Sequence, residues 1–283
     1  MFRIPILHRF TCSPHKLSNY IQVLKQQNIL PILDYINEDK KDSHANLHQL
    51  HHLIRTYPNN YIAVKLSSLN IEQTYNKVVD DSLLLADTAI KNNSKLLIDA
   101  EYYQIQHNID KIANILMSEF NRDHVHIYKT YQMYRKDTFP LLQYDILKER
   151  DYYLGVKLVR GAYYNRDKHY HILHTKIEDT HAHYNKSIQF FSEHHKDKDV
   201  LMLATHNKDS IQYAQSLLYQ STINPKHIEF AQLLGLSDHL THNLVRDGYK
   251  VFKYLPYGHL YDTFPYLVRR LYDNWQMIKN IIH

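Results

Sequence analysis

The 283-residue chain contains little cysteine and little glycine. Its single cysteine, Cys12, excludes internal disulfide bonds and any cysteine-rich zinc site, and it fits a reducing compartment rather than secretion. None of the five glycines lies in a GxGxxG or a Walker A pattern, so neither a Rossmann nor a P-loop phosphate site is expected. No apolar run is long enough to cross a bilayer.

Concentrated positive charge is also missing. The net charge is +5, but the basic residues are dispersed, so no nucleic-acid partner is predicted. The opening stretch, MFRIPILHRFTCSPHK, is basic and contains no acid, which suits a mitochondrial transit peptide as well as an ordinary basic N-terminus. The expected compartment is therefore mitochondrial in a eukaryote and cytoplasmic in a bacterium or a virus-infected cell.

What the sequence does have is an alternation of short apolar runs and amphipathic stretches. Runs of this length, bounded by polar turns, are typical of buried strands. Eight strand–helix units in a chain of this size predict one domain, residues 1–283, folded as a (β/α)8 barrel. The last helix, about 262–281, is expected over the barrel mouth. The expected strands are 29–36, 61–67, 95–101, 125–131, 153–162, 199–207, 227–235 and 249–258.

Polar side chains recur where these strands are expected to end, and barrel enzymes place their sites at the carboxyl ends of the strands. Each residue alone can be explained by a structural role, because strand lysines often lie at a rim and an aspartate after a strand often caps a helix. Their convergence on one rim favours a functional site. The candidates are Lys65, Asp99, Glu101, Thr130, Gln132, Lys157, Arg160, Thr205, His206, Asn207, Glu229, Gln232 and Tyr254.

A doubled arginine lies near the end of the chain, in TFPYLVRRLYDN (263–274). With Pro265 in its first turn, the expected helix places Tyr266, Arg269, Arg270 and Asp273 on one face. A solvated basic face is the ordinary interpretation, but the apolar neighbours indicate a packed helix. Arginine is the side chain best suited to grip a carboxylate with two hydrogen bonds.

Taken together, these stretches closely resemble the proline dehydrogenase family. The resemblance covers residues 29–274, and GVKLVRGAY together with PYLVRR is its most specific part. It implies a distorted (β/α)8 barrel that holds FAD, oxidises L-proline to Δ1-pyrroline-5-carboxylate and passes electrons to a quinone. The matching stretches are ILPILDY, VKLSSL, LIDAE, TYQMY, GVKLVRGAY, ATHN, EFAQLLG, YLPYG and PYLVRRxxDN.

The resemblance also implies a role for each matched residue. Arg269 and Arg270, helped by Lys65, would bind the proline carboxylate. Tyr254 and Tyr266 would pack over the pyrrolidine ring. Asp99 and Lys157 would be the catalytic positions, with Asp99 close to the substrate and Lys157 beside the reactive edge of the flavin. The residues implied to contact FAD are Ala100, Gln132, Lys157, Arg160, Gly161, Ala162, Thr205 and His206.

The sequence departs from the family pattern at two acidic positions and at its ends. Asp273 and Asp167 stand where glutamate is usual, so their contacts are expected to lengthen. The chain begins close to the first strand, without the extra N-terminal helices of many members. No aldehyde dehydrogenase domain is expected to follow, so a separate enzyme is expected for the second oxidation. The quinone and the oligomeric state stay open, and any membrane contact would be peripheral.

Three other functions compete with proline oxidation. Hydroxyproline oxidation would use the same chemistry, although Tyr266 would crowd the position of a hydroxyl group. A Schiff-base aldolase could use Lys65 or Lys157. A non-catalytic descendant would bind flavin without reacting with proline. No metal is expected, because the 22 histidines produce chance clusters such as HYHILH (169–174) and HAH (181–183).

Overall fold

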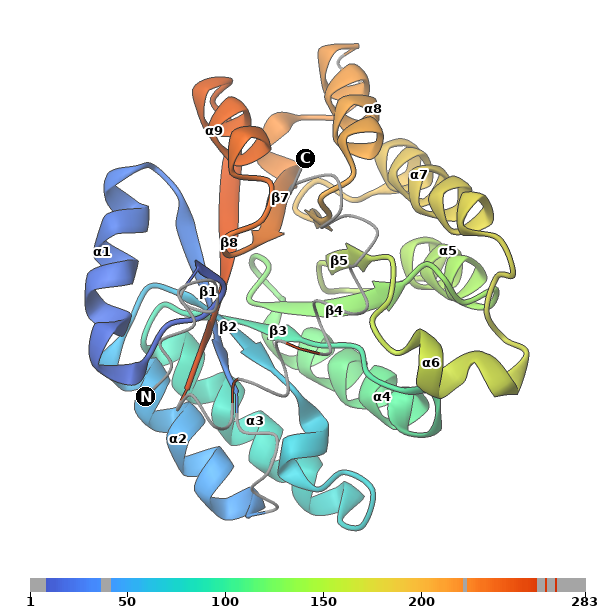
Figure 1. The fold of residues 1–283 in the computed structure, drawn as a ribbon. Helices are drawn as coiled ribbons and strands as arrows, with labels where there is room; N and C mark the ends of the chain where they lie inside the picture. The colour runs from blue at the N-terminus through green and yellow to red at the C-terminus, as the bar shows by residue number, and fades with distance from the viewer. Residues whose placement is uncertain (1–8, 37–41, 221–222, 259–262, 264–267, 269–283) are drawn as a thin grey trace.

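The computed structural model describes residues 9–36, 42–220, 223–258, 263 and 268. Its strands form a closed barrel in which each strand runs parallel to the next and β8 pairs with β1 (Figure 1). The predicted (β/α)8 fold is confirmed. The strands are β1 (Leu30–Tyr35), β2 (Tyr61–Val64), β3 (Lys95–Ile98), β4 (Ile127–Gln132), β5 (Gly155–Val159), β6 (Val200–Ala204), β7 (Ile228–Leu233) and β8 (Lys250–Tyr257).

Helices lie around the outside of the barrel in the order of the chain (Figure 1). Asp42 caps α2 by accepting hydrogen bonds from the backbone of His44 and Ala45, and Asn207 caps α8 through the Ser210 amide. The helices are α1 (Leu17–Gln26), α2 (Ser43–Thr56), α3 (Tyr75–Lys91), α4 (Tyr103–Phe120), α5 (Thr138–Leu147), α6 (Tyr164–Asp167), α7 (Ile177–His194), α8 (Lys208–Tyr219) and α9 (Asp238–Arg246), with short 3-10 turns η2 (Pro14–Lys16), η3 (Leu66–Leu69), η4 (Lys168–Tyr170) and η5 (Pro225–His227).

The strands are buried on both faces, which explains why they read as continuous apolar runs rather than alternating ones. One apolar cluster fills the barrel interior, and a larger one lies between the strands and the helices. The interior is closed by tyrosine and phenylalanine rings, with Tyr61 and Phe252 only 4.5 Å apart between centroids. The barrel is thus a packed core, and a ligand has to bind at one of its ends.

Glu229 is not at the rim where it was expected. It is the second residue of β7 and therefore lies at the amino end of the barrel. Its carboxylate accepts hydrogen bonds from the hydroxyls of Tyr61 (2.9 Å) and Tyr128 (3.0 Å) and from Nζ of Lys250 (2.6 Å). These contacts satisfy a buried charge and close the bottom of the barrel, so its predicted place in the site was wrong.

The segment between β5 and β6 is the longest connection between two strands in the described part of the chain, and it contains α6, η4 and α7. Gly161 has φ +132°, and a Cβ atom there would lie 2.2 Å from the Tyr134 ring, so this position requires glycine. Apart from residues 263 and 268, the helix expected at 262–281 lies outside the described residues, and the single domain over 1–283 stays a prediction.

Candidate active site

A cluster of lysines and carboxylates lies at the carboxyl ends of the strands. Nζ of Lys157 on β5 donates to Oδ1 of Asp99 (2.6 Å) and contacts the Tyr254 hydroxyl. That hydroxyl also donates to Oδ1 of Asp99 (3.0 Å). Lys65 follows β2, lies 3.7 Å from Oδ2 of Asp99 and pairs with Asp34 on β1. We call these five residues the lysine–carboxylate cluster.

Three strands, β1, β5 and β8, and the segments after β2 and β3 converge here because the barrel is closed. Asp99 and Lys65 come just after β3 and β2, because these strands end earlier than expected, at Ile98 and Val64. Lys157 points into the barrel, since its neighbour in register, Met202, belongs to the interior cluster. Asp34 was not predicted as a site residue, although Asp34 lies in the matched stretch ILPILDY near the end of β1.

Burial and charge act against each other in this cluster. Burial alone would raise the pKa of Asp99, but the positive charges of Lys157 and Lys65 and the hydrogen bonds that it accepts lower it below its ordinary value. Burial lowers the pKa of Lys157, and the attraction of Asp99 opposes that shift. Asp99 is therefore held as a carboxylate, and it in turn helps to keep Lys157 charged.

Arg160 forms a second group of contacts just beyond β5. Its guanidinium donates to Nδ1 of His181 (2.8 Å), to Oγ1 of Thr205 (2.6 Å) and to Oγ of Ser210 (2.9 Å). Its Cζ atom lies over the Tyr184 ring, 4.4 Å from the ring centre. All of these partners are neutral, and among the described residues no carboxylate lies within ion-pair distance of the guanidinium, although the exposed Asp209 attracts it from further away. This cation is ready to receive an anion.

His181 and Ser210 were not predicted as site residues from the sequence, because they lie on helices α7 and α8, away from any strand end.

Gln132 connects the segments after β3 and β5. Its amide donates to the backbone carbonyl of Glu101 (2.7 Å) and its oxygen accepts from the amide of Ala162 (3.4 Å). Ala100, between Asp99 and Glu101, is half-buried at the same rim. Gln132, the last residue of β4, thus brings together the segments after β3 and β5 that hold other predicted flavin-contact residues.

His206, after β6, is held as a neutral ring. Nε2 accepts from the backbone amide of Leu233 (3.3 Å), and Nδ1 lies 3.2 Å from Oγ of Ser237. Burial and the charges of Lys253 and Arg160 lower the pKa of His206 to about 3. This imidazole can hold a hydrogen bond at neutral pH but is not a source of protons.

Asp167, which stands where glutamate was expected, makes contacts of ordinary length. It is fully buried and accepts from the hydroxyl of Tyr134 (2.9 Å) and from the backbone amide of Tyr103 (3.1 Å). The Tyr134 ring that it holds is the ring against which Gly161 packs. The shorter acid therefore still fixes the loop after β5.

Four residues of the predicted site lie outside the described residues. They are Tyr266, Arg269, Arg270 and Asp273.

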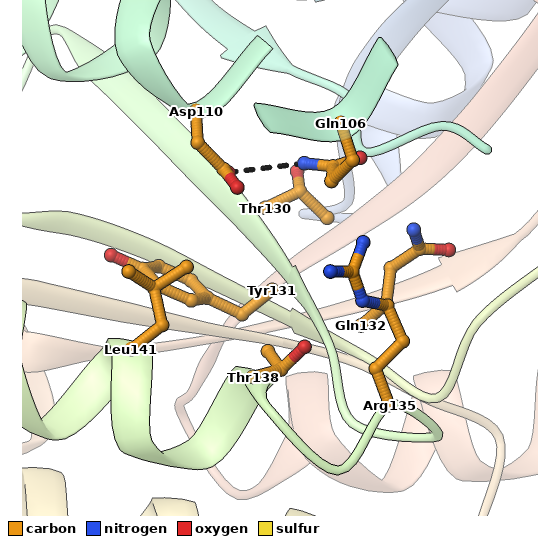
Figure 2. A pocket seen from close by; sticks show the side chains of 8 residues that line it. All are labelled: Gln106, Asp110, Thr130, Tyr131, Gln132, Arg135, Thr138 and Leu141. Atoms are coloured by element: carbon orange, nitrogen blue, oxygen red, sulfur yellow. Dashed lines mark hydrogen bonds between the residues drawn. The ribbon is translucent and has the colours of Figure 1, made fainter. Parts of the chain in front are cut away.

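A small polar cavity opens behind β4, between α4 and α5 (Figure 2). It is large enough for about one water molecule. Gln106 donates to Asp110 across it (3.0 Å), as Figure 2 shows. Oγ1 of Thr130 and Nη1 of Arg135 are buried without a hydrogen-bond partner in the described part of the chain, and both residues line this cavity. The cavity is polar, but it is far too small for a substrate.

Two histidine contacts bear on the expected absence of metal. His174 and His183, from the two clusters noted in the sequence, contact each other through ring nitrogens 3.1 Å apart. Asp123, His124 and His126 form a group whose ligand atoms lie within 4.8 Å of one another. That group is just before β4, at the amino end of the barrel and away from the candidate site. The absence of a resident metal stays a prediction.

The fold and the position of these groups define a (β/α)8 barrel with a buried, lysine-rich site at the carboxyl ends of its strands, where barrel enzymes bind their substrates. A family model described as proline dehydrogenase matches residues 17–281. The chain belongs to the proline dehydrogenase family.

Curated relatives with several names resemble the chain. Proline dehydrogenase 1, mitochondrial, of Caenorhabditis elegans is 30% identical over 84% of this chain and 41% of its own length. Hydroxyproline dehydrogenase of Xenopus laevis is 32% identical over 70% of this chain and 45% of its own length. The carbapenem antibiotics biosynthesis protein CarD of Pectobacterium carotovorum is 33% identical over 71% of this chain and 54% of its own length. The chain thus spans about half or less of each of these relatives.

Solved structures support the fold. Proline utilization A from Bdellovibrio bacteriovorus, inactivated by N-propargylglycine, superposes with a TM-score of 0.86 and 18% identity. The match covers 94% of this chain and 32% of that one. In the described ranges, no helix combines the length and the apolar character needed to cross a membrane.

Proposed function

We propose that this chain oxidises L-proline to Δ1-pyrroline-5-carboxylate, the first step of proline catabolism, with FAD as its cofactor. The observation that carries the proposal is the buried contact of Lys157 with Asp99 and Tyr254, at the functional end of the barrel in a chain of this family.

The rim residues fit a flavin dinucleotide. Arg160 uses three of its five N–H groups in hydrogen bonds to neutral partners. Two N–H groups are therefore left for a ligand. Such a guanidinium suits the pyrophosphate of FAD. A bound flavin would supply the hydride acceptor. The residues proposed to hold it are Ala100, Gln132, Lys157, Arg160, Gly161, Ala162, Thr205 and His206.

The substrate would lie over the lysine–carboxylate cluster. Lys65, together with Arg269 and Arg270, is proposed to bind the proline carboxylate, and Tyr254 and Tyr266 to cover the pyrrolidine ring. The part given to Tyr266 and the two arginines rests on the resemblance of PYLVRR. Fixing the ring in one orientation lowers the entropic part of the barrier.

Lys157 and Asp99 would supply the electrostatics of the reaction. A fixed ammonium group in a buried site stabilises negative charge that develops next to it. The Asp99 carboxylate keeps Lys157 in place through their 2.6 Å hydrogen bond. Asp99 also accepts from Tyr254, so it fixes both the cation and the aromatic wall of the site.

The electrons are proposed to pass to a quinone, with the protein touching the membrane only peripherally. The relatives of Caenorhabditis elegans, Drosophila melanogaster and human origin are named mitochondrial, which supports a mitochondrial location if the chain is eukaryotic. For a bacterial or viral source the proposed compartment is the cytoplasm.

Hydroxyproline is the second candidate substrate. Relatives from Xenopus laevis and Bos taurus are named hydroxyproline dehydrogenases, at 32% and 31% identity. We favour proline because the aromatic ring of Tyr266 would crowd a hydroxyl group on the pyrrolidine. Comparing kcat/KM for the two substrates in one assay decides between them, and a clear preference for hydroxyproline would replace our choice.

The proposed function is tested by the visible spectrum of the purified protein, before and after anaerobic addition of L-proline. We expect a flavin spectrum that bleaches with proline. Protein that holds FAD but does not bleach with either substrate would favour a non-catalytic descendant. Protein that stays colourless after FAD is supplied would contradict the proposal that the chain is a flavoenzyme. Borohydride trapping of a carbonyl substrate on Lys65 or Lys157 would then support an aldolase.

A further inference from the structure

The orientation of Arg160 depends on one histidine. Nη1 and Nη2 of Arg160 donate to hydroxyl groups, which can turn to suit either a donor or an acceptor. Nε donates to Nδ1 of His181 at 2.8 Å, and a ring nitrogen accepts a hydrogen bond only when it carries no proton. His181 must therefore be neutral, with its proton on Nε2, for this contact to exist.

A second proton on His181 would have two effects. Nδ1 would become an N–H donor facing the Nε–H donor of Arg160, so the hydrogen bond would be lost. The imidazolium would also place a positive charge at hydrogen-bond distance from a guanidinium that no described carboxylate neutralises. Both effects would push Arg160 away from the position in which Thr205 and Ser210 hold it.

The charged groups around His181 come from three elements. Arg160, after β5, opposes protonation of His181. Glu178 on the first turn of α7 and Asp209 on the first turn of α8 favour it, but both side chains are exposed and their influence is screened by solvent. Burial and Arg160 prevail, and the pKa of His181 is lowered from its ordinary value. The neutral form is thus the one present at neutral pH.

We propose that His181 is a positioning residue for Arg160, and that binding of flavin at this site weakens when His181 takes up a proton. The inference rests on the proposed function, in which Arg160 contacts FAD. It adds a residue on α7 that neither the strand-end pattern nor the matched motifs include. The proton comes from solvent, and one proton is linked to the loss of one hydrogen bond.

The experiment measures FAD affinity of the full chain by fluorescence titration between pH 5 and pH 8, in wild type and three variants. In the wild type we expect Kd to rise as the pH falls, by up to about tenfold per pH unit once His181 begins to protonate. His181→Asn presents an amide oxygen where Nδ1 was and does not titrate, so its Kd should stay low and flat. His181→Leu, without an acceptor, should bind more weakly at every pH.

His183→Asn is the matched control. It lies two residues further along α7 and contacts His174 rather than Arg160, so it should keep the wild-type pH profile. The imidazole nitrogen shifts of His181, measured by NMR on the flavin-free protein, should show the Nε2–H form. A wild type that binds FAD with the flat profile of His181→Asn overturns this inference alone. A wild type that binds no FAD at any pH overturns the proposed function and this inference with it.

Discussion

Replacing Lys157 by methionine tests the electrostatic argument directly. Methionine keeps the length of the side chain but removes the charge that contacts Asp99 and Tyr254. Removing one donor aimed at developing charge in a buried site costs about 10²–10³ in rate. We therefore expect anaerobic bleaching of bound flavin by proline to slow by about 10²–10³-fold in Lys157→Met, as measured by stopped flow.

The same substitution disturbs the cluster in the absence of substrate. Asp99 would keep Lys65, 3.7 Å away, but lose its nearest cation. The pKa of Asp99 should therefore rise, because burial would be opposed by less positive charge. Breaking a buried pair on one side costs about 3–5 kcal/mol, so the free energy of unfolding should fall as well.

A control must separate this loss of stability from the loss of chemistry. Lys253 is also a buried strand lysine, and its Nζ pairs with Asp238 at 2.9 Å, away from the lysine–carboxylate cluster. Lys253→Met should destabilise the fold and leave flavin reduction within a few-fold of wild type. Equal rates for Lys157→Met and wild type, or equal slowing in both variants, would refute the role given to Lys157.

Three further predictions concern stability. His206→Gln keeps an acceptor for Leu233 but does not titrate. The pKa of His206 falls from 6.5 to about 3 on folding, so as the pH drops the unfolded chain binds the proton first and stability is lost below pH 6.5. Chemical denaturation at several pH values should show a shallower loss between pH 6 and pH 4 in the variant, by up to about 1.4 kcal/mol per pH unit, and parallel curves would contradict this. Thr130→Val should destabilise by about 1 kcal/mol if a water molecule bridges the cavity groups, whereas a gain in stability would mean that the cavity is dry. Gly161→Ala should cost more than Gly248→Ala in thermal denaturation, because both have positive φ but only Gly161 faces a ring; equal costs would argue against that contact.

Most of the fold could be predicted because both faces of every strand are buried. ILPILDY and YIAVKLS read as apolar runs for that physical reason, and the parallel order follows from the intervening helices. The strand ends were less certain, since a run of apolar residues does not say where pairing stops. Lys65 and Asp99 were thus expected inside the strands 61–67 and 95–101, near their ends, and instead they follow β2 and β3.

The site could be predicted only as far as strand ends and matched motifs reach. Lys157, Asp99 and Tyr254 were named and do come together. His181 and Ser210 could not be named, because their contact with Arg160 depends on how α7 and α8 pack beside β5 and β6. Such contacts arise from tertiary structure and leave no local pattern.

Glu229 shows why residue type alone does not identify a site. Both ends of the barrel interior hold a buried carboxylate that accepts from tyrosine and lysine: Asp99 at one end and Glu229 at the other. The difference lies in strand direction. Glu229 is near the start of β7, where loops return from helices, and its partners close the barrel bottom. Asp99 follows the end of β3, where the chain turns outward into the loops that build a site. The same chemistry is structural at one end and available to a ligand at the other.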